Sequence, residues 1–186
     1  SPRSYNSQIG VPLSVWQMTA QNSLAIFEAG ISESGEMEKL GKIIQPTIGI
    51  LTNIGDAHNE GFTNTNEKFS EKIKLFTNAE ILIGRAKDFT VQKVEQSSSI
   101  QKPIIKTYGF SLENEFVIQS VNIKETHSEV SIQYKANAAI VIVPFIDNAS
   151  IENAITCICT MLQLGYHFAT INERMALLEP VEMRMQ

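Results

Sequence analysis

Two segments of the sequence combine an apolar run with polar side chains that are suited to ligand binding. Residues 47–62, TIGILTNIGDAHNEGF, pass from an apolar run into a polar stretch that contains His58. Residues 23–35, SLAIFEAGISESG, repeat the pattern, and there the apolar run ends in Glu28. In open α/β sheets, ligands bind just outside the carboxyl ends of the strands. A carboxylate at one strand end and a histidine at the other therefore suggest a metal or phosphate site.

Glu28 and His58 each have a functional and an ordinary interpretation. A carboxylate at the Glu28 position is an oxygen ligand of the kind that Mg²⁺ prefers, and the alternative is a solvated acid at a strand end. His58, in a loop with glycine and aspartate, fits a metal ligand, a proton carrier or a surface residue. The residues alone leave these alternatives open.

Three further side chains have chemistry suited to a nucleotide site. Lys72 lies near the edge of the buried face of a predicted helix, although Glu71, Lys72 and Lys74 together are also typical of a solvated helix face. Asn153 stands near the start of an apolar helix. Its amide could offer both a donor and an acceptor to a base edge, and the alternative is an ordinary polar residue in the first helical turn. Arg184 is suited to a phosphate or is a plain surface arginine.

Composition limits the classes of protein to which the chain belongs. Its 186 residues are 43% hydrophobic and 19% charged, which is ordinary for a globular protein. The net charge of -5 argues against non-specific nucleic-acid binding, and no apolar run approaches the length of a membrane span. Cys157 and Cys159 are two apart in a predicted helix and point away from each other, so we expect two reduced thiols, as in a cytoplasmic protein.

The spacing of apolar residues indicates the elements that would position these side chains. Strand–helix alternation in the first part of the chain predicts an α/β fold with a mostly parallel sheet, flanked by helices and connected by right-handed crossovers. Three alternating or apolar segments within residues 115–143 predict a small three-stranded antiparallel sheet. The predicted helices are 11–20, 36–44, 64–78, 89–94, 151–164 and 170–178, and the predicted strands are 23–27, 47–51, 80–83, 103–108, 115–124, 129–135 and 138–143.

Six segments, taken in order, resemble the central, ATP-binding domain of the Mur ligases. Within that family the chain is most similar to the branch that adds D-alanyl-D-alanine to UDP-N-acetylmuramoyl-tripeptide, in the Bacteroidetes type that is often fused to an alanine racemase. The segments are YNSQIGVPLSVW (5–16), AIFEAGISESGEMEKL (25–40), LTNIGDAHNEGF (51–62), EKIKLF (71–76), SIENAITCICTMLQLG (150–165) and LEPVEMR (178–184).

The resemblance implies a P-loop-NTPase-like fold and a set of site residues. It implies ATP and Mg²⁺ as cofactors, with pyridoxal phosphate only in a fused racemase domain outside this chain. It also implies an acyl phosphate on the nucleotide-linked peptide that the incoming amine attacks, a reaction that depends on positioning and charge neutralisation. By resemblance, Glu28 and His58 are the Mg²⁺ ligands, and Lys72 is the lysine that is carbamylated in several members. Asn153 would contact adenine and Arg184 the ATP phosphates. Asn6 would contact the nucleotide-peptide substrate.

The sequence departs from the family pattern in two places. Ala149-Ser150 replaces the His-Asn pair that many members have at a helix start. No GxxxxGK[ST] phosphate loop occurs, and in the family this loop precedes the YNSQIG segment. We therefore expect residues 1–186 to be a central-domain fragment without the UDP-binding and C-terminal domains, and inactive alone. The alternatives are a folylpolyglutamate synthase-like or cyanophycin synthetase-like ligase, or a non-catalytic degenerate ligase module.

Overall fold

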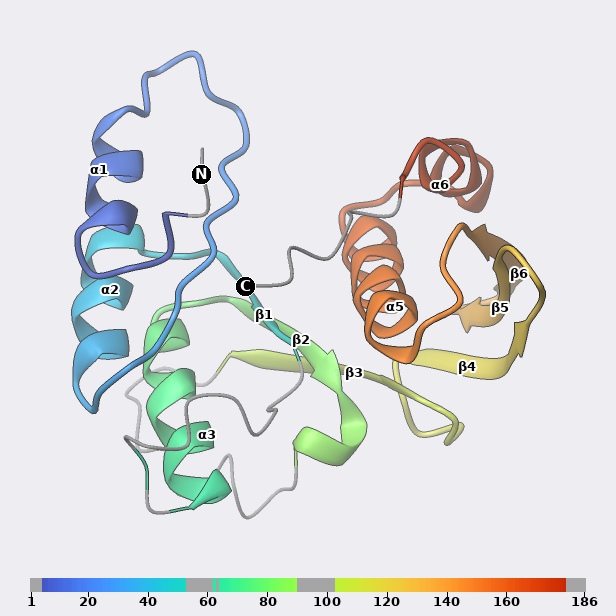
Figure 1. Ribbon diagram of the computed structural model, residues 1–186, viewed down its shortest axis with the longest axis horizontal. Coiled ribbons are helices and arrows are strands. Elements are labelled where there is room, and N and C mark those ends of the chain that lie inside the picture. The colour runs from blue at the N-terminus through green and yellow to red at the C-terminus, as the bar shows by residue number, and fades with distance from the viewer. Residues whose placement is uncertain (1–4, 53–61, 63, 90–102, 180–186) are drawn as a thin grey trace. The chain divides into compact units, whose positions relative to one another are not determined.

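The computed structural model describes residues 5–52, 62, 64–89 and 103–179, which divide between two compact units (Figure 1). Unit 1 comprises Ser1–Gly49, Asn53–Leu82 and Asp88–Ile105, and unit 2 comprises Ile50–Thr52, Ile83–Lys87 and Lys106–Gln186. No helix among the described residues is long and apolar enough to cross a membrane.

One six-stranded sheet runs through the fold in the order β1-β2-β3-β4-β5-β6. The starts of β1, β2 and β3 adjoin, because Glu80 N donates to Thr47 O over 2.9 Å and Ile104 N donates to Glu80 O over 2.8 Å. β3 and β4 pair in parallel. The strands are β1 (Ile48–Leu51), β2 (Ile81–Arg85), β3 (Ile104–Gly109), β4 (Phe116–Ile123), β5 (Ser128–Tyr134) and β6 (Asn137–Val143). The predicted α/β class with a mostly parallel sheet is confirmed.

The predicted three-stranded meander is also present, as β4, β5 and β6. These strands pair antiparallel, with Val117 opposite Gln133 and Val130 opposite Val141. Alternate residues, Val130 and Ile132 among them, are fully buried, which is the period-2 pattern of a sheet with one covered face. The meander is not a separate sheet, because the parallel β3–β4 pairing makes it a continuation of the strands before it.

Helices α1 (Gly10–Trp16), α2 (Glu36–Ile44) and α3 (Thr65–Ile73) belong to unit 1, and a 3₁₀ turn, η3 (Lys74–Phe76), follows α3. α2 has the predicted bounds. α1 is shorter than the predicted 11–20, because Thr19 N and Oγ1 both bond to Asn22 Oδ1 at 2.7 and 3.2 Å. Such local side-chain bonds compete with helix continuation.

The strand predicted at 23–27 is wrong. Residues 24–30 form no strand in the structure, and Leu24 and Ile26 are 63% and 72% exposed. An apolar run becomes a strand only where a neighbouring strand forms a continuous ladder along it. Apolar content therefore did not determine the secondary structure of this segment. The helix predicted at 89–94 falls almost wholly outside the described residues.

Gly41 lets α2 approach η3 closely within unit 1. A Cβ at this position would lie 2.9 Å from the carbonyl oxygen of Leu75 and 3.2 Å from that of Lys74. Glycine in a helix interior normally costs stability relative to alanine. Here the close backbone contact explains its presence.

We therefore expect Gly41→Ala to destabilise the protein, by about 1–3 kcal/mol, since backbone must shift to relieve the overlap. Urea unfolding monitored by circular dichroism measures this. Lys39→Ala, on the exposed part of the same helix, serves as the control and should be nearly neutral. A higher free energy of unfolding for Gly41→Ala would contradict this expectation, because it would mean that η3 can move away from α2 at little cost.

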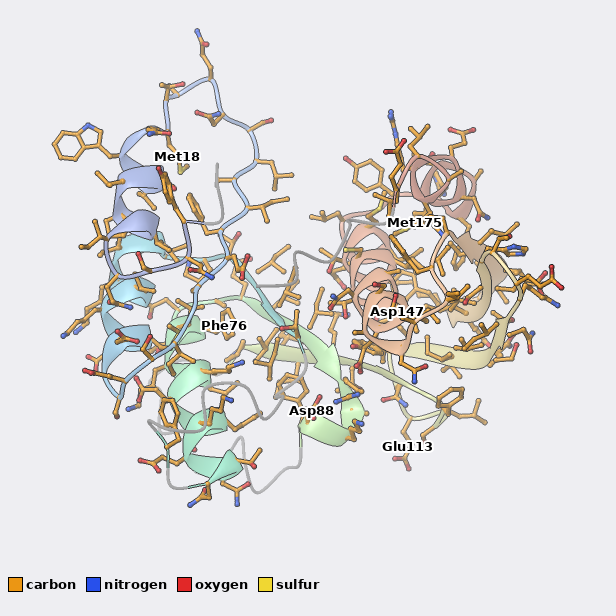
Figure 2. The ribbon with its side chains drawn as sticks, viewed as in Figure 1. Met18, Phe76, Asp88, Glu113, Asp147 and Met175 are labelled. Atoms are coloured by element: carbon orange, nitrogen blue, oxygen red, sulfur yellow. The ribbon has the colours of Figure 1, made fainter. Side chains whose placement is uncertain are left out.

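In the described part of unit 2 the helices are α5 (Asn148–Gln163) and α6 (Phe168–Met175). Asp147 caps α5 by accepting from Ser150 N over 2.8 Å, and Figure 2 labels it at the start of the helix. The helix buries Ile151, Ile155 and Ile158, which follow helical spacing. Beyond its end, Gly165 adopts a left-handed φ of 90°, a conformation that suits glycine at this position.

Asn172 of α6 closes the free edge of the sheet. Its Nδ2 donates to Ile140 O over 3.1 Å, and its Oδ1 accepts from Ile142 N over 3.0 Å. β6 is the outermost strand on this side, so the side-chain amide occupies backbone groups that another strand would otherwise pair with.

Asn172→Ala is therefore expected to lower the free energy of unfolding by about 1–3 kcal/mol, because a backbone donor and acceptor lose their partners. We also expect more self-association, since the edge opens. Urea unfolding and light scattering measure the two effects. Glu173→Ala, an exposed neighbour, should change neither, and an equal result for both variants would contradict a role for Asn172 at the edge.

Candidate functional site

The structure brings two of the predicted site residues, Asn6 and Glu28, together in unit 1. Asn6 Nδ2 donates to Glu28 Oε1 over 3.3 Å, and Gly30 N donates to Asn6 O over 2.8 Å. A Cβ on Gly30 would lie 3.3 Å from Asn6 Cγ, so the two segments are in close contact. The Glu28 side chain is exposed. Its carboxylate is thus oriented by one amide and remains accessible to a cation.

The loop that follows Glu28 is fixed by two other carboxylates. Glu36 Oε2 accepts from the backbone N–H groups of Ser32 and Glu33 at 2.7 and 3.0 Å. Glu71 Oε1 accepts from Gly35 N over 2.6 Å, and its Oε2 accepts from Ser34 Oγ over 3.3 Å. The segment that carries Glu28 is therefore held by Asn6 at one end and by α2 and α3 at the other.

Glu71 is a buried charge, not part of the solvated helix face that its neighbours suggested. Its side chain is only 2% exposed and pairs with Lys74 Nζ at 2.6 Å. Burial alone raises the pKa of Glu71, but the hydrogen bonds from Lys74, Gly35 and Ser34 outweigh it and leave that pKa below its usual value. The carboxylate therefore stays ionised and joins α3 to the loop after Glu28.

Lys72, the next residue of α3, is half-buried. Burial, first, and the positive charge of Lys68, second, lower the pKa of Lys72. Lys68 is itself buried and lies one helical turn earlier. More of Lys72 is therefore present as the neutral amine than is usual for a lysine, and the neutral amine is its nucleophilic form.

Asn153 is placed in unit 2, exposed near the start of α5. Beside it lies a contact that the sequence did not reveal. Arg85, the last residue of β2, forms an ion pair with Glu152. Tyr108 near the end of β3 bonds through its hydroxyl to Thr156 Oγ1 at 3.0 Å. The strand was predicted to end at residue 83, whereas β2 extends to Arg85 and so places this side chain at a strand end, where ligand-site residues often lie.

Two predicted site residues, His58 and Arg184, lie outside the described residues. Among the described residues, no three His, Cys, Asp or Glu side chains gather as a metal cluster. Cys157 and Cys159 are both free thiols, one exposed and one buried, as their spacing predicted.

Comparison with known proteins identifies the family. The profile of the Mur ligase middle domain matches residues 1–161. A UDP-N-acetylmuramoyl-tripeptide–D-alanyl-D-alanine ligase from Borreliella burgdorferi is 33% identical over 170 residues, which are 90% of this chain and 36% of that protein. The ligase of the same name from Bacillus subtilis is 27% identical over 165 residues, or 87% of this chain and 34% of that protein.

Solved structures agree on the fold. MurF from Acinetobacter baumannii matches with a TM-score of 0.80 at 20% identity, over 95% of this chain and 39% of that one. MurF from Thermotoga maritima in complex with ADP matches with a TM-score of 0.73 at 19% identity, over 92% of this chain and 40% of that one. The chain thus spans little more than a third of the length of these proteins. With residues 1–161 matched by its middle-domain profile, this chain belongs to the Mur ligase family.

Proposed function

We propose that this chain is the central, ATP-binding domain of a longer ligase that joins D-alanyl-D-alanine to UDP-N-acetylmuramoyl-tripeptide in peptidoglycan synthesis. The names of the relatives from Borreliella burgdorferi and Bacillus subtilis support the substrate pair. The observation that carries the proposal is the Asn6–Glu28 contact, since it brings a predicted substrate-binding amide to a predicted metal ligand. A cytoplasmic location is part of the proposal, because ATP is the energy source.

Glu28 fits a Mg²⁺ ligand. Its carboxylate is exposed and held by a neutral amide, so its charge is not cancelled by an ammonium or guanidinium group within the described residues. Magnesium commonly binds through one or two carboxylates together with substrate phosphates. When bound, the ion would neutralise phosphate charge, and Asn6 would keep the Glu28 oxygens oriented. His58 remains the proposed second protein ligand, and Arg184 the proposed phosphate contact.

Lys72 fits the proposed carbamylated lysine. The ammonium first loses one proton to give the neutral amine. The amine nitrogen then attacks the carbon of CO₂: a C–N bond forms, a C=O π bond opens to an oxyanion, and the nitrogen loses a second proton. A side chain of charge +1 thereby becomes a carbamate of charge −1, with two protons released. The lowered pKa favours the reactive amine, and Lys68 one turn away would then face an anion in place of a cation. Asn153, exposed on α5, is the proposed adenine contact.

The test uses the full-length protein that contains this chain. Phosphate release from ATP should require both UDP-N-acetylmuramoyl-tripeptide and D-alanyl-D-alanine. The isolated 186 residues, which carry no GxxxxGK[ST] motif, should release none. Release that depends on glutamate in place of D-alanyl-D-alanine would favour a folylpolyglutamate synthase-like ligase. The absence of any acceptor-dependent release would favour a non-catalytic module.

A further inference from the structure

Two side-chain contacts fix the first turns of α5 within unit 2. Arg85 at the end of β2 pairs with Glu152, and Tyr108 of β3 bonds to Thr156 one turn further along the helix. Thr156 Oγ1 in turn donates to Glu152 O over 2.9 Å, so Tyr108 is the donor to Thr156. The start of α5 is thereby tied to the carboxyl ends of β2 and β3.

Both contacts are shielded from water. The Arg85 and Glu152 side chains are each 22% exposed, so their attraction is screened less than that of a surface pair. Tyr108 is buried, and desolvation, chiefly, raises its pKa to about 12. The hydroxyl therefore stays protonated and keeps donating at any physiological pH.

The stability of α5 does not depend on these two polar contacts. The helix already packs through Ile151, Ile155 and Ile158, and a partly buried ion pair is commonly no more stabilising than an apolar pair of the same volume. What the pair adds is orientation, because it fixes the rotation and height of the helix at one residue. That residue is the immediate neighbour of Asn153, whose amide is exposed.

We propose that the Arg85–Glu152 ion pair is a positioning device that orients Asn153 toward the adenine base, and so sets the preference of the site for adenine. The inference rests on the proposed ATP-binding function. Asn153 is the residue that meets the base, whereas Arg85 and Glu152 act through it. A base is discriminated by hydrogen bonds of fixed geometry, so a small rotation of α5 weakens discrimination before it weakens phosphate binding.

The test measures kcat/KM of the full-length protein with ATP and with inosine triphosphate, in which a carbonyl replaces the adenine amino group. Arg85→Ala and Glu152→Ala should each reduce the preference for ATP by about tenfold to a hundredfold, as misplaced contacts do. The effect should lie in KM for ATP and leave kcat nearly unchanged. Exchanging the charges, in the double variant Arg85→Glu with Glu152→Arg, should restore most of the preference.

A double-variant cycle separates positioning from general destabilisation. Arg85→Ala added to Asn153→Ala should cost no further preference, because the pair acts through that amide. Glu115→Ala is the matched control, since its ion pair with Lys106 over 2.8 Å lies in the same unit with 19% and 34% exposure. It should leave the preference unchanged. If a variant does not fold by circular dichroism, Arg85→Lys and Glu152→Gln replace it.

Calorimetric binding of ATP and inosine triphosphate distinguishes the two proposals. If the wild-type protein bound ATP in preference to inosine triphosphate but catalysed no ligation, the proposed ligase function would be wrong. The role of the Arg85–Glu152 ion pair in base preference could still be tested by binding. An unchanged preference in folded Arg85→Ala, additive losses with Asn153→Ala, or a wild-type protein without preference would each overturn the inference.

Discussion

Glu28→Ala in the full-length protein is expected to lower D-alanyl-D-alanine-dependent phosphate release by more than about 100-fold. Even the residues that orient a metal ligand contribute about 10–100-fold in affinity or activity, and Glu28 is proposed as a ligand itself. The loss should be partly recovered at high Mg²⁺, because a weakened site still fills at higher concentration. Stability should change little, since the side chain is exposed and accepts one bond of 3.3 Å.

The control is Glu33→Ala, five residues further along the same segment. Glu33 is exposed, and its backbone N–H, which Glu33→Ala keeps, donates to Glu36. Glu33→Ala removes the same charge from the same segment of chain, so any effect of net charge alone would appear in both variants. Equal activities for Glu28→Ala and Glu33→Ala would eliminate Glu28 as a metal ligand.

Glu71→Ala is expected to cost about 2–4 kcal/mol in the free energy of unfolding. The change removes the buried carboxylate that accepts from Gly35 N and Ser34 Oγ, and hydrogen bonds to a charged group contribute about 1.5–3 kcal/mol each. Lys74 contributes less to this cost, because at 44% exposure it regains water when the carboxylate is gone. Urea unfolding near neutral pH measures the difference.

The pH dependence of Glu71 follows from the sign of its shift. Its pKa is lower in the folded protein than the usual 4.5, so the folded state favours the ionised form. The stabilisation is present above about pH 4.5 and is lost as the pH falls through the folded-state pKa. Glu71→Gln should therefore show a shallower loss of stability than wild type between pH 5 and about pH 3.

Glu38→Ala is the matched control for Glu71→Ala. Glu38 also pairs with a lysine on its own helix, Lys42, at 2.7 Å. Both partners are exposed, at 56% and 71%, so this pair should add little to stability. If the two variants unfolded at the same urea concentration, Glu71 would not hold the loop after Glu28 to α3.

The sequence was sufficient wherever the deciding interactions are local. Apolar spacing predicted α2 with its observed bounds, and period-2 alternation predicted the meander of β4, β5 and β6. A helix or strand repeats its geometry every few residues, so one-sided burial leaves a periodic pattern in the chain. The order of the motifs along the chain likewise indicated the family.

Local pattern failed where the outcome depended on a distant partner. Residues 24–30 have strand-like composition and form no strand. Glu71, together with Lys72 and Lys74, suggested a solvated helix face, yet Glu71 is buried and accepts from Gly35, 36 residues earlier. The burial of a charged side chain depends on whether distant donors reach it, and nothing in the residues beside it encodes that.

The residue types available for chemistry, their order and most of the helices and strands thus follow from local sequence. Which of these residues come into contact depends on how the elements pack. Asn6 and Glu28 are 22 residues apart and touch, and Arg85 pairs with Glu152 across the fold of unit 2. Periodicity carries information over one or two turns, whereas a site is made by contacts between elements, and those exist only once the chain has packed.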